Sequence, residues 1–515
     1  MKRPSSPSTL DAMLAYWAAT RPEHTAVVCE DDQYSYETVE KAVGNLARLL
    51  VRTGLQPGDT LCSLVPKSFD FVVAFLATLR VRALYLGLST ETQATDLAST
   101  LAGLRARWLL VGGEASQALT ATARLPLDLS VVHLDRSELL EPSDDRGAPD
   151  CHGEMGSPCY LNATSGTTGS PKFVVATHAN LAWNCISAID TFGLRPGDVH
   201  LCTFPVHVHP HESIARAIYS GGATIVEEFK PRRVVERIVR GEVTHLMSSP
   251  AVFRLLLDTK PESGREGGSL RIAEAGGAVT TRELSREFTD RFGLPLTPVW
   301  GSSETTGMAL AVAADDDVRD QYPLGRCCSS YLAECADLET GLPLDRTGEI
   351  GELRVAGPGV ASRYFGSADN HVFQQGWYHT GDLVRRQADG VFYFVGRKHD
   401  MVKASGLRVY PLEIETIIQS HPSVREAVVM GAIDPERGER LAALVVPRDG
   451  HSLSIRELAF FCSQRLESHK VPRLIRLCRA LPRNDLGKVD RIAALAAIDP
   501  DRRLRALSFS ESPDG

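Results

Sequence analysis

The chain has 515 residues, of which 43% are hydrophobic and 23% are charged, a composition typical of a globular protein large enough for two or three cores. The formal net charge of -8 at pH 7 argues against the basic surface of a nucleic-acid-binding protein, so we expect no nucleic-acid partner. No apolar run reaches the roughly 18 residues of a membrane span, and the polar start at 1–9 lacks the apolar core of a secretory signal. We therefore expect no membrane span.

The eleven cysteines are scattered along the chain. They form no CxxC pair and show none of the regular spacing of a disulfide scaffold or a zinc site. We expect reduced thiols, many of them buried, in a cytoplasmic protein. A catalytic cysteine stays open as an alternative.

Up to about residue 395, short apolar runs alternate with amphipathic stretches. The apolar runs predict strands at 26–29, 108–111, 131–134, 223–226, 244–247 and 271–273. The amphipathic stretches predict helices at 69–79, 234–240 and 281–292. This alternation indicates stacked α/β layers with largely parallel sheets. Shorter strands at 352–355 and 391–395 follow.

A second, smaller unit is predicted to begin near residue 396. It should contain helices at 412–420 and 455–466, strands at 424–433 and 441–446, and a polar turn at 434–440. The predicted fold class is therefore α/β, with a large N-terminal domain of stacked α/β subdomains and a small C-terminal α+β domain. The predicted boundaries are 1–396 for the first domain, 397–399 for a hinge and 400–515 for the second domain.

The most informative segment is the loop Thr164-Ser-Gly-Thr-Thr-Gly-Ser-Pro-Lys172, which precedes a strand-like run at 173–175. Its glycines and hydroxyl groups let backbone N–H groups converge on an anion, and Lys172 closes the loop. It is not a Walker A loop, because the lysine follows proline and no Ser or Thr comes after it. A polar surface turn is the alternative, but the order of residues favours phosphate binding. The candidate phosphate-binding residues are Thr164, Ser165, Gly166, Thr167, Thr168, Gly169 and Lys172.

This loop resembles the phosphate loop of the acyl-adenylate-forming (ANL) superfamily, which includes acyl- and aryl-CoA synthetases, peptide-synthetase adenylation domains and firefly luciferase. Four more segments resemble motifs of that family in the same order: Trp300-Gly-Ser-Ser-Glu-Thr305, Tyr378-His-Thr-Gly-Asp-Leu383, 396–415 and 482–491. The resemblance spans essentially the whole chain. It implies an enzyme that uses ATP to convert a small carboxylic acid into an acyl-adenylate, releases pyrophosphate, and transfers the acyl group to the thiol of CoA.

The resemblance also implies roles for single residues. ATP and a carboxylate are both anions, so their repulsion must be offset by cations and oriented N–H groups. Glu304 is expected to bind Mg²⁺, and Ser303 to contact the α-phosphate or the substrate carboxylate. Asp382 is expected to accept both ribose hydroxyls, and Arg397 to donate to the ribose or a phosphate. Taken singly, each has a plain alternative as an exposed acid, a turn residue or a surface arginine.

The segment 275–278 resembles the part of the family that contacts adenine. Gly277 and Ala278 would let the backbone lie against a flat ring, and Trp300, followed by Gly301, would supply an aromatic face. An ordinary strand-to-helix turn is the alternative.

Two lysines are expected to serve the two half-reactions. Lys488, in the C-terminal motif, would neutralise the carboxylate and the α-phosphate during adenylation. Lys403 and Gly406 would face the incoming thiol after the small domain rotates as a mobile lid about a hinge at His399. For Lys403 a solvated surface position is the alternative. The family commonly has Asp or Lys at the hinge, and it has glycine where this chain has Phe173.

A third departure lies in Phe204-Pro-Val-His-Val-His-Pro-His-Glu212, where the family begins to line the acyl pocket. His207, His209 and His211 alternate, so an extended chain would place all three on one face. A metal site, ordinary packed histidines, and hydrogen bonds from one or two of them to the substrate stay open. Met308 is a further candidate contact to the substrate.

The nature of the acid and of the thiol is less constrained. We find no Asp near 204–212 of the kind that pairs with an α-ammonium group, and 406–415 resembles CoA synthetases more than peptide-synthetase domains. Both points favour an acid without an α-amino group. Transfer to the phosphopantetheine of an acyl carrier protein, a standalone amino-acid adenylation enzyme, and a catalytically silent nucleotide-binding protein are the alternatives. The expected oligomeric state is a monomer or a homodimer.

Overall fold

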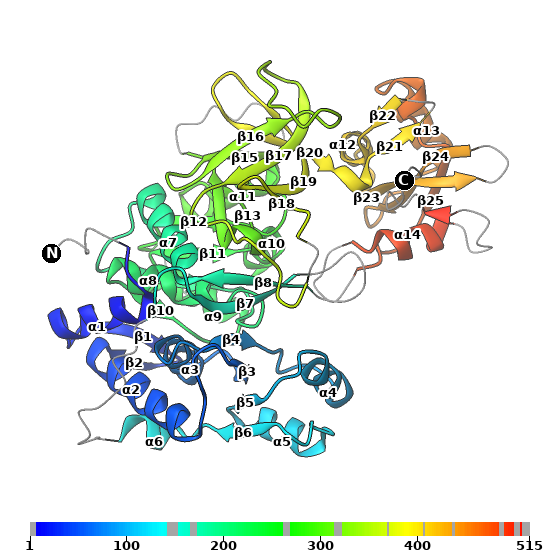
Figure 1. The fold of residues 1–515 in the computed structure, drawn as a ribbon. Coiled ribbons are helices and arrows are strands. Elements are labelled where there is room, and N and C mark those ends of the chain that lie inside the picture. Colours follow the sequence, from blue (N-terminus) through cyan, green and yellow to red (C-terminus); the bar gives the residue numbers. More distant parts are fainter. Residues whose placement is uncertain are drawn as a thin grey trace. The chain divides into compact units, whose positions relative to one another are not determined.

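The computed structural model describes residues 7–141, 153–164, 172–260, 268–313, 322–367, 370–404, 407–434, 438–483, 489–498 and 505–506. The chain divides into two compact units (Figure 1). The first comprises Met1–Ala333, Arg354–His379 and Asp389–Val391, and the second comprises Glu334–Leu353, Thr380–Ala388 and Phe392–Gly515. The domain boundary at 396 stays a prediction.

One sheet of the first unit has the strand order β6-β5-β3-β4-β7-β8. Its strands are β3 (Thr60–Leu64), β4 (Leu84–Gly87), β5 (Trp108–Val111), β6 (Ser130–His133), β7 (Pro158–Thr164) and β8 (Lys172–Thr177). All neighbours pair in parallel except β7 and β8, which are antiparallel. The helices of this part are α2 (Tyr36–Arg52), α3 (Phe69–Arg80), α4 (Ala94–Gly103), α5 (Glu114–Thr122) and α6 (Arg136–Leu140).

A second sheet of the first unit runs in the order β15-β14-β13-β12-β11-β9-β10-β1-β2. Its strands are β1 (Thr25–Cys29), β2 (Asp32–Ser35), β9 (Val199–Cys202), β10 (Ala223–Ile225), β11 (His245–Ser248), β12 (Ile272–Ala275), β13 (Thr297–Ser302), β14 (Gly307–Ala311) and β15 (Pro323–Cys327). The strands from β1 to β13 are parallel, and β14, β15 and β2 add antiparallel edges. The helices are α1 (Leu10–Thr20), α7 (His178–Phe192), α8 (Ala215–Ser220), α9 (Pro231–Val239), α10 (Pro250–Asp258) and α11 (Arg282–Phe292).

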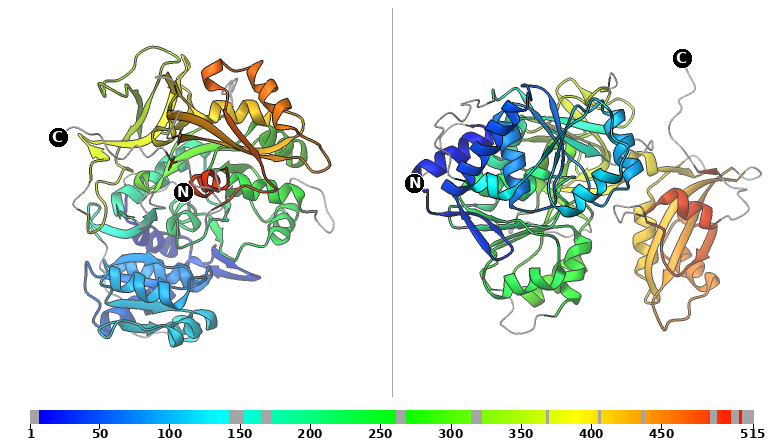
Figure 2. Two further views of the ribbon diagram at one scale, coloured as in Figure 1. Left: turned by 90° about the vertical axis from the view of Figure 1, so that its right-hand side faces the viewer. Right: turned by 90° about the horizontal axis from the view of Figure 1, so that it is seen from below.

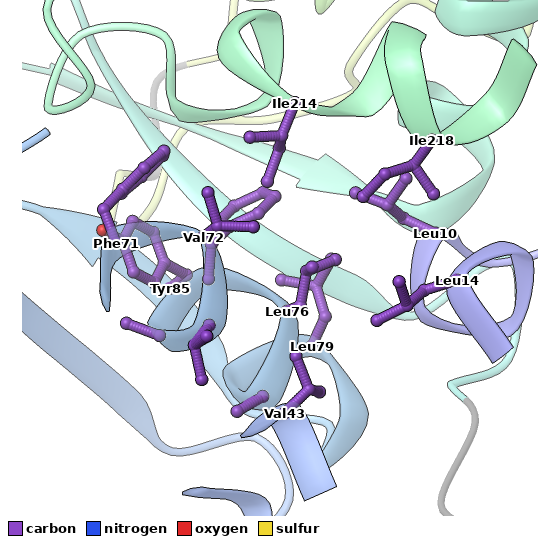
Figure 3. Packing of buried hydrophobic residues seen from close by; sticks show 14 of the residues in the cluster. Leu10, Leu14, Val43, Phe71, Val72, Leu76, Leu79, Tyr85, Ile214 and Ile218 are labelled. Atoms are coloured by element: carbon purple, nitrogen blue, oxygen red, sulfur yellow. The ribbon is translucent and has the colours of Figure 1, made fainter. Parts of the chain in front are cut away.

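The helix α3 is packed inside the first unit, and its residues are buried except for Asp70. Its sequence is apolar on every side, which is the pattern of a helix packed between other elements. Figure 3 shows side chains of α1, α2, α3 and α8 gathered in one cluster, in which Leu76 and Leu79 of α3 lie near Val43 of α2. This cluster joins the two sheets of the unit through their helices.

The second unit contains a sheet with the strand order β25-β24-β23-β26. The bounds of its strands are β23 (Val424–Asp434), β24 (Gly438–Pro447), β25 (Leu474–Leu477) and β26 (Arg505–Ala506), and its helices are α12 (Pro411–Gln419), α13 (Ile455–Ser463) and α14 (Arg491–Ile498). The helices α12 and α13 pack on one face of β23 and β24, and α14, red in Figure 2, packs on the other face. The expected small α+β unit is therefore present.

The remaining strands lie between residues 332 and 409. They are β16 (Leu332–Ala336), β17 (Ile350–Ala356), β18 (Phe373–Gln374), β19 (Trp377–Arg386), β20 (Phe392–Arg397), β21 (Val402–Ala404) and β22 (Leu407–Val409). The order β16-β17-β19-β20 forms a continuous run in one sheet, and β21 and β22 form a separate hairpin. The polar turn predicted at 434–440 is wrong in length, because β23 continues to Asp434 and β24 already begins at Gly438.

Two further properties bear on the expectations above. Among the helices that the structure describes, none combines the length and apolarity that a membrane crossing requires. The ten cysteines within the described ranges are all free thiols, and eight of them are buried.

Candidate nucleotide and acyl-acid site

The two ends of the predicted phosphate loop lie opposite each other on an antiparallel pair of strands. Thr164 ends β7 and Lys172 begins β8, and the two residues are paired in register. The Thr164 hydroxyl donates a hydrogen bond to the carbonyl oxygen of Lys172 at 3.2 Å. The residues between them, Ser165, Gly166, Thr167, Thr168 and Gly169 among them, lie outside the described residues. The structure thus fixes where the loop leaves and re-enters the sheet.

Lys172 is linked to Glu304 by a residue that the sequence did not reveal. The Lys172 ammonium lies 5.3 Å from the centroid of the Tyr364 ring, a distance at which a cation is attracted to an aromatic face. The Tyr364 hydroxyl donates a hydrogen bond to Glu304 Oε1 at 2.8 Å. A tyrosine in a loop carries no spacing signal, so only the three-dimensional contact identifies it.

The backbone around Tyr364 holds this contact in place. Phe365 N donates to the carbonyl oxygen of Phe173 at 2.7 Å, and Val175 N donates to that of Arg363 at 3.2 Å, so the segment lies along β8. Ala361 N donates to the carbonyl oxygen of Glu304 at 2.8 Å. Phe173, which replaces the family's usual glycine, is partly buried against the cluster of hydrophobic residues around β3 to β5. Its ring therefore turns into the core.

Glu304 lies in a short 3-10 turn, Ser303–Thr305, directly after β13. Ser302 caps this turn, because its hydroxyl accepts from Thr305 N while Ser302 N donates to the Thr305 hydroxyl. Ser303 is partly buried, and the Glu304 side chain is buried. The residue after this turn, Thr306, has φ of 54°. This left-handed conformation costs a β-branched residue on the order of 1–3 kcal/mol.

The carboxyl end of the parallel strand β12 leads to the candidate adenine segment. Gly277 has φ of 78°, a conformation that glycine adopts without strain. Trp300 is buried in β13. A Cβ atom at Gly301 would collide with the carbonyl oxygen of Gly307. The glycine in this motif is thus required by the close approach of two strands. Ala278, next to Gly277, is exposed.

The two candidate ribose residues lie together in the second unit. Asp382 on β19 and Arg397 on β20 are paired in register, and Arg397 Nε lies 2.7 Å from Asp382 Oδ1. Asp382 is buried, whereas the Arg397 side chain is about half exposed (47%). Asp382 N also donates to the Thr380 hydroxyl at 3.0 Å, which fixes the backbone of the Thr-Gly-Asp motif.

The candidate hinge and lid residues follow Arg397 in the chain. His399 lies in the short 3-10 turn Lys398–Asp400, with its side chain about half exposed and Nε2 3.6 Å from Asp400 Oδ1. Asp400 also pairs with Arg491 at 3.1 Å. Lys403 is exposed on β21, opposite Arg408. Gly406 and Lys488 lie outside the described residues.

Two models of one protein family match the chain. The model described as AMP-binding enzyme matches residues 14–365, and the model of the AMP-binding enzyme C-terminal domain matches residues 413–488. The chain belongs to the AMP-binding enzyme family. The family that the motifs predicted is therefore confirmed.

The chain is similar to CoA ligases over nearly its whole length. It is 28% identical to the indoleacetate–CoA ligase of Aromatoleum aromaticum, over 92% of this chain and 94% of that protein. It is 29% identical to a crotonobetaine/carnitine–CoA ligase of Escherichia coli, over 91% and 95% of the two chains. The crystal structure of ATP-bound MatB from Rhodopseudomonas palustris is similar with a TM-score of 0.85 and 26% identity, over 96% and 100% of the two chains. The predicted fold class is thereby confirmed.

The three histidines of segment 204–212 in this AMP-binding enzyme do not share one face of an extended strand. The segment turns at 206–208 and then forms a 3-10 helix that begins at Pro210. His209 Nδ1 lies 3.1 Å from Asn162 Nδ2, whereas His211 Nδ1 lies 2.8 Å from the Tyr160 hydroxyl. The expectation of a common face is wrong, because the chain already turns at 206–208 and is not extended.

The metal interpretation of these histidines finds no support within the part of the chain that the structure describes. No group of three or more His, Cys, Asp or Glu side chains there is arranged to hold a metal ion. His211 is buried and hydrogen-bonded, which fits an ordinary packed histidine. Burial lowers the pKa of His207. Met308 is buried at the start of β14.

Next to these histidines lies a buried cluster of charged residues that the sequence analysis missed. Arg216 Nη2 lies 3.0 Å from Glu212 Oε2, and Arg216 Nη1 also pairs with Glu274. His245 Nε2 lies 3.1 Å from the same Glu274 oxygen, and His200 Nδ1 lies 3.0 Å from His245 Nδ1. His200 Nε2 donates to the carbonyl oxygen of Glu212 at 2.8 Å, which closes a ring. The four-residue spacing of Glu212 and Arg216 in the sequence is the one signal of this pair.

Proposed function

We propose that the chain is an AMP-forming acid–CoA ligase, which activates a small carboxylic acid with ATP and transfers the acyl group to CoA. The contact chain from Lys172 through Tyr364 to Glu304 carries this proposal. It joins a cation at the end of the predicted phosphate loop to a buried carboxylate. The CoA-ligase activities named for the similar proteins support the same reaction class.

Glu304 fits the requirements of a magnesium ligand. Its carboxylate is buried, and the hydrogen bond from Tyr364 orients one of its oxygens. Mg²⁺ prefers one or two carboxylate oxygens together with phosphates and water. When bound, it supplies positive charge that offsets the charge of the phosphates.

In the first half-reaction, a carboxylate oxygen of the acid attacks the α-phosphorus of ATP. The bond from that phosphorus to the bridging oxygen of the β-phosphate breaks, and pyrophosphate leaves with the electron pair. We assign the terminal phosphates to the 164–172 loop and Lys172, and the α-phosphate or carboxylate to Ser303. Lys488 supplies a further cation to the attacking carboxylate and the α-phosphate.

The nucleoside is assigned to two sets of residues. Asp382 accepts hydrogen bonds from the ribose hydroxyls, and Arg397 donates to the ribose or a phosphate. A paired carboxylate with a neighbouring guanidinium suits this task, because both are strong and directional hydrogen-bonding groups. The adenine contacts are Gly277, Ala278, Trp300 and Gly301.

In the second half-reaction, the thiol sulfur attacks the carbonyl carbon of the adenylate. The bond from that carbon to the phosphate oxygen breaks, AMP leaves, and the thiol proton is released. We propose that Lys403 and Gly406 face the thiol after the small domain pivots at His399. Such a rearrangement lets one pocket serve two steps and keeps water from the anhydride.

For the substrate pocket we propose His207, His209 and Met308. The Asn162 amide, in the orientation observed, donates to His209 Nδ1, so the ring proton of neutral His209 lies on Nε2. His209 then has a donor suited to a polar group of the acid. The aromatic and trimethylammonium acids of the named relatives give the first compounds to try.

The test is the acid-dependent exchange of labelled pyrophosphate into ATP. The panel contains indoleacetate, ferulate, crotonobetaine, benzoate and the common amino acids, and CoA or a phosphopantetheine-bearing carrier protein is then offered to each active acid. We expect exchange with a carboxylic acid lacking an α-amino group, followed by a CoA thioester. If none of the acids supports exchange, the proposal is contradicted. If a thioester forms only with the carrier protein, the acceptor is that protein and not CoA. The cytoplasmic location stays a prediction.

A further inference from the structure

The turn that follows Glu304 contains two left-handed residues in succession. Thr306 has φ of 54° and Gly307 has φ of 111°. Glycine adopts this region freely, but a β-branched threonine does not. Thr306 is fully buried, so no solvent interaction offsets the strain. A strained residue two positions after a candidate metal ligand calls for a partner that holds it.

The partner of Thr306 is His211. His211 Nε2 donates to the Thr306 carbonyl oxygen at 3.0 Å, and the Tyr160 hydroxyl lies 2.8 Å from His211 Nδ1. Because a carbonyl oxygen only accepts, Nε2 must carry a proton. Both ring nitrogens therefore have a hydrogen-bond partner, and these two bonds orient the buried ring.

The residue after His211 supports the same turn from another direction. Glu212 Oε1 lies 3.5 Å from His211 Nε2, and a Cβ atom added to Gly307 would collide with that Glu212 oxygen. Glu212 is itself held by Arg216 at 3.0 Å. The 3-10 helix that carries His211 and Glu212 is thus packed directly against Thr306 and Gly307.

The turn is also tied internally. The Thr305 hydroxyl donates to the carbonyl oxygen of Gly307 at 2.6 Å, and the Tyr331 hydroxyl donates to the carbonyl oxygen of Thr305 at 2.8 Å. These bonds hold Thr305 and Gly307, and the bond from His211 holds the carbonyl of the strained Thr306. A rotation of the Thr306 peptide would change the direction of the preceding Ser303–Thr305 turn and of Glu304.

We propose that His211 is a positioning residue that, through the Thr306 carbonyl, fixes the direction of the Glu304 carboxylate for magnesium. The inference rests on the proposed function, in which Glu304 is the magnesium ligand. His211 touches neither the nucleotide nor the metal. It acts on metal affinity by holding the backbone of the ligand, as residues behind a metal site commonly do.

The test compares two replacements of His211, one that keeps the hydrogen bond to the Thr306 carbonyl oxygen and one that loses it. Glutamine places an amide N–H about as far from Cα as Nε2 of histidine, so His211→Gln keeps the donor to Thr306. Asparagine is too short to reach that carbonyl, so His211→Asn loses the bond. A matched control is His178→Asn, which removes another buried imidazole at the start of α7, away from this turn.

The readout is the binding of Mn²⁺ in the presence of ATP. It is measured from the electron paramagnetic resonance signal of the Mn²⁺ that stays free. We expect His211→Asn to weaken binding by about 10- to 100-fold, and His211→Gln and His178→Asn to bind within about threefold of the unchanged protein. A wild-type protein that does not bind Mn²⁺ with ATP contradicts the proposed function. If the wild-type protein binds Mn²⁺ and the His211→Asn variant binds it equally tightly, only the role of His211 is contradicted.

A second variant keeps the test decisive if His211→Asn folds poorly. In His211→Asn/Thr306→Gly, glycine adopts the left-handed conformation without help. We expect this double variant to recover most of the lost Mn²⁺ affinity, to within about threefold of the unchanged protein. A folded double variant, checked by its thermal unfolding, that still binds at least tenfold more weakly overturns the inference.

Discussion

Arg397 Nε lies 2.7 Å from Asp382 Oδ1, and the two residues face each other in register on β20 and β19. The buried carboxylate is thereby held beside a partly exposed guanidinium. Replacing Arg397 removes the ion pair that holds the Asp382 carboxylate in position. We expect Arg397→Ala to raise the KM for ATP by about tenfold or more, which is about 1.4 kcal/mol of binding. Pyrophosphate exchange at varied ATP measures this.

The control for Arg397→Ala is Arg425→Ala, another partly exposed arginine of the second unit, which lies near Glu426 and Asp449. We expect this variant to keep the KM for ATP of the unchanged protein. Equal effects of the two replacements would show that Arg397 contributes only general surface charge.

Tyr364 gives a second prediction, because its hydroxyl donates to Glu304 at 2.8 Å. Tyr364→Phe keeps the ring beside Lys172 but removes this bond, whose net contribution to stability is about 0.5–1.5 kcal/mol. We expect the Mg²⁺ concentration for half-maximal pyrophosphate exchange to rise about three- to tenfold. Tyr34→Phe, in a tyrosine stacked on Phe69, should leave it unchanged. An unaltered requirement in Tyr364→Phe would remove Tyr364 from the account of the site.

The two lysines of the C-terminal part are expected to separate the half-reactions. Lys488→Ala should lower pyrophosphate exchange by about 10²–10³-fold, as the loss of a preorganised donor does. Lys403→Ala should retain exchange but fail to form thioester when CoA is added. The reverse pattern would exchange the roles of the two residues.

Glu212 makes a prediction about acid stability. Burial raises the pKa of this carboxyl, but Arg216 and His211 outweigh burial and hold the pKa well below its ordinary value. The stabilisation is therefore present above the unfolded-state pKa of about 4.3 and is lost as the pH falls below that value toward the folded-state pKa. We expect Glu212→Gln to flatten the fall of the unfolding free energy with decreasing pH in that interval. Parallel curves for both proteins would contradict it.

The helix α3 gives a prediction about the fold. Leu76 is fully buried in the cluster of Figure 3, whereas Leu127 is fully exposed. Leu76→Ala should lower the free energy of unfolding by about 2–5 kcal/mol, because it removes packed methyl groups and leaves a cavity. Leu127→Ala should change it by about 0.5 kcal/mol or less. Denaturant unfolding followed by circular dichroism checks both variants.

Elements with a strong hydrophobic period could be predicted closely from the sequence. The strand expected at 108–111 is β5, and the helix expected at 69–79 is α3 with one more residue. The turn at 434–440 was predicted too long, because hydrogen bonds between β23 and β24 involve only the main chain and continue past the last apolar side chain. A change to polar residues in the sequence therefore does not mark the end of the strand.

Some residues of the candidate site could likewise be predicted from the sequence, and others could not. Thr164, Lys172, Glu304, Asp382 and Arg397 follow from ordered motifs. Tyr364 and Tyr160 could not be predicted, because each acts through contacts with residues distant in the chain: Lys172 and Glu304 for Tyr364, and His211 for Tyr160. Such contacts leave no local pattern. The prediction of a common face for the three histidines is wrong for a local reason, the turn at 206–208 ahead of the 3-10 helix that begins at Pro210.

The buried ion pairs of Arg216 with Glu212 and Glu274 constrain how this protein can diverge. Removing Arg216 leaves two buried carboxylates without this counter-ion, at a cost of about 3–5 kcal/mol, whereas apolar side chains in all three places remove every one of these charges at once. Substitutions at these positions should therefore be inherited together. Across descendants of a common ancestor, we expect the three sites to covary as either a complete ionic set or a complete apolar one.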